Sequence, residues 1–304
     1  MTRLPWLAAL AALVAVGLAG CSPPPAPAAS PPGTTGRSSQ PAPAESAADA
    51  ERPDWARFFQ AEGGTGTFVL LDSQTGQTQR LDPERAARRY LPASTFKVYN
   101  ALVALQTGVV GDPDSTFVWD GVEREVAAWN RDHTLRTGME SSTVWLYQRV
   151  ARRLGRDRYL AAFVRQPYGN GVVGPDVDLF WLDNSLRISA DEQARFVDGL
   201  RRGALAFRPG VQDTVRAILP VLAEGAGGRL VGKTGLGRQP DGTPLGWIAG
   251  WVERDGRAAA FAMNVEPDPA APREIEMVPA RLRIVRAVLA DAGWLGPDGH
   301  QGRP

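Results

Sequence analysis

The chain has 304 residues, of which 43% are apolar, and this is enough to build a globular protein around one large hydrophobic core. Its 34 Lys and Arg residues nearly cancel its 33 Asp and Glu residues, which leaves a formal net charge of +1. A balanced charge gathers neither nucleic acid nor an anionic membrane surface, so we expect neither partner.

The first residues are typical of a lipoprotein export signal. Arg3 precedes an apolar run from Leu4 to Ala19, and Leu18-Ala19-Gly20-Cys21 resembles a lipobox. We therefore expect residues 1–20 to be removed, Cys21 to be lipidated, and the lipid to be the protein's only contact with a membrane. An ordinary cleaved signal or a short anchor helix is the alternative, and it is disfavoured because the run is shorter than the ~20 residues that a membrane span needs.

The predicted localisation is the cell envelope, on the periplasmic face of the outer membrane if the cell has two membranes. Residues 21–51 are rich in Pro, Ala and Ser, which predicts a tether, followed by a catalytic domain at 52–295 and a tail at 296–304. Because Cys21 is the only cysteine, the folded part has no disulfide, thiol nucleophile or cysteine metal ligand.

The order of the predicted elements indicates the fold class. Two β-prone runs around a turn predict a hairpin at 66–72 and 77–81. The apolar periodicity then predicts helices at 94–106, 142–154, 156–165, 190–202 and 211–223. Strand character returns at 230–232, 246–252 and 258–265, and a closing helix is expected at 277–290.

This order favours an α+β protein, in which N- and C-terminal helices flank an antiparallel sheet and an all-α region is inserted between its strands. An active site is expected where the sheet meets that region.

The chain contains only two lysines, Lys97 and Lys233, and writes arginine at every other basic position. Arginine cannot replace an amine that must lose its proton, so both lysines are candidate functional residues. Lys97 follows Ser94 by three residues, and Lys233 begins Lys233-Thr234-Gly235. Two lysines could occur in the chain by chance. That both would also occur by chance within these two sequence motifs is not plausible.

Ser94 and Lys97 lie three residues apart, which places them on one face of a helix. A serine hydroxyl becomes a nucleophile when a base takes its proton, and lysine can be that base when desolvation lowers its pKa. The apolar neighbour Phe96 would help to desolvate the amine. Helix N-terminal amides near Ser94 would stabilise an oxyanion, whereas a helix cap is the structural alternative for this serine.

Other kinds of catalytic site lack their residues in this sequence. There are two histidines, of which His300 falls in the predicted tail and His133 in a polar loop, where we expect an exposed side chain. A Ser-His-Asp triad and a zinc site are therefore disfavoured, and no cofactor or metal is expected. A phosphate-loop pattern at residues 227–234 is disfavoured too, because the glycines and prolines that follow cannot form the required helix.

Ser-x-x-Lys with Lys-Thr-Gly is similar to the penicillin-recognising serine enzymes as a group. Further motifs resemble class D β-lactamases (oxacillinases) in particular, in order and spacing over residues 55–292: Ser142-Thr143-Val144, Tyr168-Gly169-Asn170, Phe180-Trp181-Leu182, Leu186-Arg187-Ile188-Ser189, Gly246-Trp247 and Gly250-Trp251-Val252-Glu253.

The resemblance implies hydrolysis of β-lactam antibiotics, with resistance as the result. Ser94 would be the nucleophile, and Lys97 would carry a CO2-derived carbamate (N6-carboxylysine) as general base for both chemical steps. Trp181 would donate its N–H to the carbamate, and Val144 would keep the pocket apolar. Ser142 would relay a proton to the lactam nitrogen.

The remaining implied roles concern the bound drug. Lys233 would supply positive potential, Thr234 and Arg273 would bind the drug carboxylate, and the backbone N–H groups of Ser94 and of Leu236, which follows Gly235, would form the oxyanion hole. Packing and solvent-facing roles are the plainer alternatives for Trp181, Val144, Leu236 and Arg273. The alternative function is a β-lactam sensor, or a penicillin-binding transpeptidase-like protein, which acylates without turnover.

Overall fold

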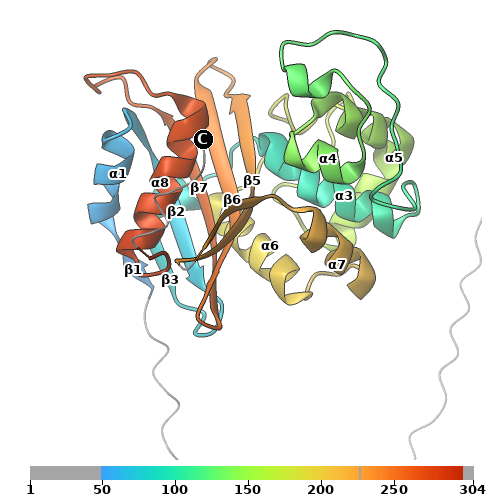
Figure 1. Ribbon diagram of the computed structural model, residues 1–304. Helices are drawn as coiled ribbons and strands as arrows, with labels where there is room; N and C mark the ends of the chain where they lie inside the picture. Colours follow the sequence, from blue (N-terminus) through green and yellow to red (C-terminus); the bar gives the residue numbers. More distant parts are fainter. Residues whose placement is uncertain (1–48, 226, 297–304) are drawn as a thin grey trace, which may run out of the picture. The chain divides into compact units, whose positions relative to one another are not determined.

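The computed structural model describes residues 49–225 and 227–296. The predicted signal peptide, Cys21, His300 and nearly all of the predicted tether and tail lie outside these residues. The described part is built on a seven-stranded sheet with the order β1-β3-β2-β7-β6-β5-β4 (Figure 1). The strands are β1 (Ala50–Glu51), β2 (Gly64–Asp72), β3 (Thr78–Leu81), β4 (Val221–Gly225), β5 (Gly228–Arg238), β6 (Pro244–Arg254) and β7 (Arg257–Pro267).

All neighbouring strands pair antiparallel except β1, which runs parallel to β3 through Ala50 and Glu51. The tether was predicted to extend to residue 51, and this boundary was wrong by a few residues. Asp49 also pairs with Arg80, with an Oδ2–Nη1 distance of 2.7 Å. The last residues of the predicted tether therefore belong to the folded domain, although their composition resembles that of the preceding segment.

Helices cover both faces of the sheet, and an all-α region lies beyond β5 (Figure 1). The helices are α1 (Ala56–Gln60), α2 (Pro83–Ala87), α3 (Lys97–Gln106), α4 (Leu135–Glu140), α5 (Val144–Arg165), α6 (Ala190–Arg202), α7 (Pro209–Ile218) and α8 (Met277–Asp291), with 3-10 turns η1 (Pro53–Trp55), η2 (Ala93–Phe96) and η3 (Ala127–Trp129). The predicted α+β fold class is confirmed, with terminal helices on the sheet and an inserted helical region.

Two hydrophobic clusters hold these layers together. One lies between the sheet and helices α1 and α8, and contains Trp55, Phe68 and Phe261. The other is larger, joins α6 and the helical region to the opposite face of the sheet, and contains Phe96 and Trp181. Each fully buried large apolar side chain contributes about 1.5–3 kcal/mol. Phe96, which lies between Ser94 and Lys97 in the sequence, packs against Trp181 in the second cluster. This packing anchors the segment from Ser94 to Lys97 in the core.

Most predicted elements occur where the periodicity placed them, and the hairpin and α6 agree closely. The segment 142–165 is a single helix from Val144, interrupted at Gly155 (φ 72°), which agrees with the predicted break at that residue. The predicted helix over 211–223 was wrong at its end. Leu219 is extended before Pro220, which cannot continue a helix, and Val221 begins β4. Within the described residues, no helix combines the length and apolar character that a membrane span requires.

Candidate active site

Ser94 lies in the 3-10 turn η2, directly before α3, rather than in the first turn of an α-helix as expected. The turn is held by a hydrogen bond from the Thr95 hydroxyl to the Pro92 carbonyl, 2.7 Å long. Ala93 has a left-handed backbone (φ 47°), a conformation that costs about 1–2 kcal/mol for a residue with a side chain. The surrounding core over-determines this strained turn, which fixes where the Ser94 hydroxyl points.

The Nζ atom of Lys97 lies 2.5 Å from the Oγ atom of Ser94, and the Lys97 side chain is completely buried. Burial, reinforced by the positive charge of Lys233, holds the pKa of the Lys97 amine well below its usual value. A neutral amine has a free lone pair and can accept the proton of the Ser94 hydroxyl. The structure thus brings together the two residues that the sequence predicted as nucleophile and base.

Aromatic rings lie in the core next to Lys97. Phe96 stacks on Trp181 with ring centroids 5.5 Å apart, and the Lys97 amine lies 5.7 Å from the centre of the Tyr147 ring. Val144, at the start of α5, is half-buried. The indole Nε1–H of Trp181 is buried and has no acceptor among the described residues. An unpaired buried donor costs about 1–3 kcal/mol, so this pocket would gain from an anionic or polar acceptor.

Ser142 immediately precedes the first residues of α5 and is half-buried, with a left-handed backbone (φ 56°). Its neighbour Thr143 donates its backbone N–H to the Gly138 carbonyl, and its hydroxyl lies 3.2 Å from Nε2 of His133. His133 was expected to be exposed, and this was wrong, since it is only 1% exposed. Burial lowers its pKa, so its neutral ring is a structural support for the Ser142 loop.

Strand β5 carries Lys233, Thr234 and Gly235 along the Ser94 turn. A Cβ atom at Gly235 would lie 3.1 Å from the Pro92 carbonyl oxygen and 3.3 Å from the Thr95 methyl group, so the missing side chain lets the strand approach the turn. Lys233 is buried, its Nζ atom donates to the Thr234 carbonyl at 3.0 Å, and burial, together with the charge of Arg281, lowers its pKa to about 7. Leu236 is 44% exposed at the edge of the site.

The structure does not bring Arg273 to this strand. Arg273 lies on the connection from β7 to α8, its side chain is 56% exposed, and its guanidinium pairs with Glu62 at 3.1 Å. Arg281 of α8 is buried instead and donates a hydrogen bond to the Gly235 carbonyl. Of these two arginines, Arg281 is the one that contacts the Lys233-Thr234-Gly235 segment, so it is a second candidate for the carboxylate-binding arginine, and the role predicted for Arg273 stays a prediction.

Arg281 has a signal of its own in the sequence, although the family motif pointed to Arg273 instead. Arg281 shares the sheet-facing side of α8 with the buried residues Ile284, Val285 and Val288. A cation within an apolar helical face is seldom buried without a partner or a function. Burial lowers the pKa of Arg281 to about 10, so its guanidinium stays charged at neutral pH. No group of three His, Cys, Asp or Glu side chains that could hold a metal ion occurs in residues 49–225 and 227–296.

The site therefore joins a serine, a buried neutral amine and two further basic groups beside strand β5. Such an arrangement suits transfer of an acyl group to Ser94 from a substrate that carries an anionic group. A sequence profile of the penicillin-binding protein transpeptidase domain matches residues 66–284.

Relatives with known names agree with this profile. The chain is 38% identical to the β-lactamase OXA-2 of Salmonella typhimurium over 251 residues, which cover 82% of this chain and 87% of that protein. It is 38% identical to the β-lactamase OXA-48 of Klebsiella pneumoniae over 217 residues, covering 71% and 81%. The crystal structure of FUS-1 (OXA-85), a class D β-lactamase from Fusobacterium nucleatum subsp. polymorphum, superposes with a TM-score of 0.73 at 31% identity, covering 80% of this chain and 98% of that one.

The buried amine predicts how stability depends on pH. The pKa of Lys97 is lower in the folded state than in the unfolded chain, so the unfolded chain binds the proton more tightly and stability rises with pH between the two values. In CO2-free buffer we expect Lys97→Met to increase the free energy of unfolding below pH 8, and the gain to shrink toward pH 10. One such group changes the slope by at most about 1.4 kcal/mol per pH unit.

Urea unfolding at several pH values measures this effect. Leu102→Met, a neutral change at a buried position of the same helix, is the control and should shift stability equally at every pH. Parallel pH profiles for the wild type and Lys97→Met would show that Lys97 titrates in the folded protein as it does in water.

Proposed function

The chain belongs to the class D β-lactamases, and from this premise we propose that it confers resistance by hydrolysing β-lactam antibiotics through an acyl-enzyme on Ser94, with a carboxylated Lys97 as general base. The observation that carries the proposal is the 2.5 Å approach of the buried Lys97 amine to the Ser94 hydroxyl. The group on Lys97 takes the proton of Ser94, whose oxygen attacks the lactam carbonyl. The backbone N–H groups of Ser94 and Leu236 then stabilise the oxyanion.

The surroundings of Lys97 fit a carbamate formed from CO2. The neutral amine that burial favours is the form that reacts with CO2, and the carbamate supplies an anionic base for both acylation and deacylation. A carbamate would also accept the otherwise unpaired Nε1–H of Trp181. The half-buried Val144 would keep water away from it, because a drier pocket strengthens each of these polar contacts.

The basic groups along β5 fit the drug's carboxylate. We assign its binding to Thr234 and Arg281, with Lys233 supplying positive potential beside the lactam nitrogen. Ser142 would return a proton to that nitrogen when the ring opens. The Leu236 side chain, 44% exposed, borders the same edge and would contact the drug's substituents.

The alternative is a sensor or transpeptidase-like protein, which the transpeptidase profile also accommodates. It would acylate Ser94 once and stop. The distinction is whether water can attack the acyl-enzyme, which depends on the base at Lys97.

We expect Ser94→Ala to abolish hydrolysis of a chromogenic cephalosporin while leaving the thermal midpoint nearly unchanged, because among the described residues Ser94 is the only hydroxyl within hydrogen-bond distance of the Lys97 amine. Ser115→Ala, on an exposed loop, should behave as the wild type. Mass spectrometry of the penicillin-treated wild type should place the adduct on the peptide containing Ser94. A burst of one equivalent without turnover would select the sensor alternative.

Trp181→Phe tests the carbamate. In degassed buffer at pH 6 we expect the variant to lose a larger share of its activity than the wild type loses, and to need more bicarbonate to recover it, because the carbamate loses its N–H donor. We also expect deacylation to slow more than acylation. Trp251→Phe is a matched control, since Trp251 is another buried indole whose Nε1–H lacks an acceptor among the described residues. Activity independent of bicarbonate, with no carbamate signal from 13C-labelled CO2, would leave Lys97 acting as a plain amine.

Arg281→Ala is expected to raise KM for a penicillin by about tenfold, the usual effect of removing one charge-assisted hydrogen bond. The same substitution should matter much less for a penicillin methyl ester, which has no carboxylate to bind. Arg273→Ala should leave both KM values close to wild type, because Arg273 pairs with Glu62 instead. If Arg273→Ala instead raised KM for the free acid and not for the methyl ester, carboxylate binding would be assigned to Arg273.

We further propose that the protein is an envelope lipoprotein, anchored through Cys21 by its acyl chains and, in a cell with two membranes, facing the periplasm from the outer membrane. The support is the lipobox sequence at residues 18–21 and the proline-rich segment after it. Cys21→Ser should move active enzyme from the membrane fraction to the soluble envelope fraction. A wild-type protein that is soluble and carries no lipid would contradict the proposal.

A further inference from the structure

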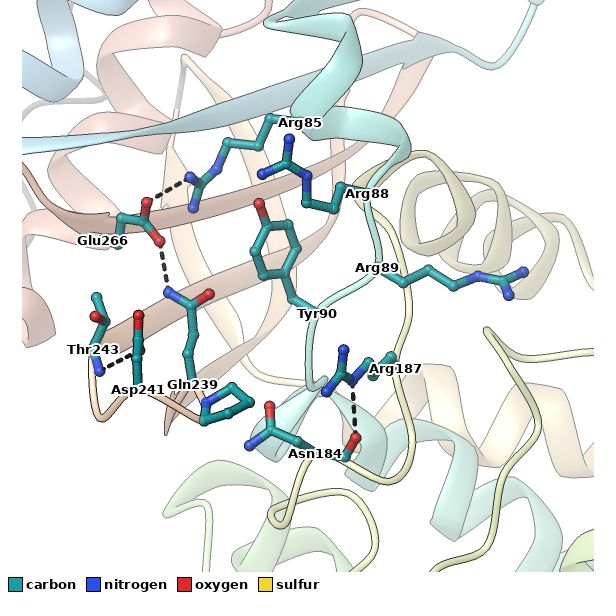
Figure 2. A pocket seen from close by; sticks show the side chains of 11 residues that line it. Arg85, Arg88, Arg89, Tyr90, Asn184, Arg187, Gln239, Asp241, Thr243 and Glu266 are labelled. Atoms are coloured by element: carbon teal, nitrogen blue, oxygen red, sulfur yellow. Dashed lines mark hydrogen bonds and ion pairs between the residues drawn. The ribbon is translucent and has the colours of Figure 1, made fainter.

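A cavity of about 340 Å³, whose lining does not include Ser94, lies where three segments meet (Figure 2). One wall comes from the chain between α2 and the Ser94 turn, another from the loop after Trp181, and the third from the β5–β6 loop together with the end of β7. We call it the arginine pocket, and its lining residues are Arg85, Arg88, Arg89, Tyr90, Asn184, Arg187, Gln239, Pro240, Asp241, Thr243 and Glu266.

Four arginines and two carboxylates line the pocket, and the arginines are not equally neutralised. Arg85 pairs with Glu266 at 2.7 Å, and Arg89 pairs with Glu192 at 2.5 Å. Arg88 pairs with Glu84, but both side chains are more than half exposed, so that pair is weak.

Arg187 has no ion pair within residues 49–225 and 227–296. The only hydrogen bond of its side chain to those residues runs from Nε to the Asn184 carbonyl, at 3.0 Å. The second carboxylate, Asp241, is exposed on the β5–β6 loop and bonds the Thr243 backbone N–H. The guanidinium group of Arg187 is therefore available to a bound anion.

A buried hydrogen-bond donor next to the pocket also favours anion binding. Arg85 is only 9% exposed, and its Nη2 atom has no acceptor among the described residues. Its guanidinium also lies 5.0 Å from the centre of the Tyr90 ring. The floor of the pocket is thus an aromatic ring backed by a charge whose hydrogen bonds are incomplete.

We propose that the arginine pocket binds a small molecule that carries two carboxylate groups. Figure 2 shows Arg88 and Arg187 on opposite sides of Tyr90, so each could hold one carboxylate while the ring supports the atoms between them. Guanidinium groups bind carboxylates through two parallel hydrogen bonds, and the volume is within the range of small-molecule sites.

The proposed reaction itself makes such a molecule, and this source rests on the proposed function. When water opens a β-lactam, the C–N bond breaks, the carbonyl carbon takes the hydroxyl and the nitrogen takes a proton. A penicillin with one carboxylate becomes a product with two. A free dicarboxylate such as glutarate offers the same chemistry without the reaction.

The walls of the pocket also belong to the segments that hold the catalytic residues. Tyr90, four residues before Ser94, exchanges two backbone hydrogen bonds with Ile188, at 2.8 and 2.9 Å. The Asn184 side chain donates to the Arg238 carbonyl at the end of β5, at 3.2 Å. A bound dicarboxylate would thus link the loop after Trp181 to β5 and to the segment before the Ser94 turn.

The test is a calorimetric titration of the full-length enzyme whose Ser94 is covered by a boronic acid, so that the active site cannot take up the ligand. The probes are ring-opened benzylpenicillin, glutarate, acetate and inorganic phosphate, at constant ionic strength. We expect one equivalent of each dicarboxylate to bind, with acetate and phosphate at least tenfold weaker. Arg88→Gln and Arg187→Gln should each weaken dicarboxylate binding about tenfold.

Arg158→Gln is the matched control, because Arg158 is exposed and also bonds one backbone carbonyl, and it should bind as the wild type. Binding of the ring-opened drug alone identifies the product as the ligand, and equal binding of glutarate identifies a general dicarboxylate site. Absence of dicarboxylate binding, phosphate binding of equal strength, or insensitivity to Arg187→Gln overturns the proposal. Turnover of a chromogenic cephalosporin, measured on the same samples without boronic acid, tests the proposed function separately.

Discussion

The site depends on a lysine amine that is buried beside a serine, and no carboxylate of residues 49–225 and 227–296 forms an ion pair with it. A charged ammonium in this position would be costly, so the core that surrounds Lys97 selects its neutral form. The same burial that favours a proton-accepting amine also restricts it, because Lys97 is completely enclosed with its Nζ atom 2.5 Å from the Ser94 Oγ atom and 5.7 Å from the centre of the Tyr147 ring. Reactivity and rigidity therefore come from one set of packing contacts.

Three separate parts of the chain must meet for this environment to exist. The Ser94 turn begins the inserted helical region, the loop with Ser142 starts α5, and β5 comes from the sheet. Gly235 allows β5 to approach the Ser94 turn, since any side chain at this position would press on the Pro92 carbonyl. Close packing across the boundary between sheet and helices thus positions groups that are far apart in the sequence.

Chemistry that is local in sequence could be predicted, whereas contacts between distant segments could not. Ser94 and Lys97 are three residues apart, so helical geometry alone brought them together, and the scarcity of lysine drew attention to Lys233. The burial of His133 depends on Trp145 and Thr143, which local polarity does not reveal. Arg273 was predicted from a motif, whereas Arg281 was not predicted, because its contact with Gly235 depends on the packing of α8 against β5 and β6. The end of α7 was overestimated because apolar periodicity continued past Pro220.

The place where the domain begins has a mechanical consequence. β1 is a two-residue strand at one edge of the sheet, held by its pairing with β3 and by the Asp49–Arg80 ion pair. Four strands separate it from β5, which corresponds to roughly 24 Å at the usual spacing of strands. Tension applied through the amino-terminal side, by a lipid or by an artificial surface linker, would peel β1 away before loading the catalytic edge. The enzyme can therefore be held from this end while its active site bears none of the applied tension.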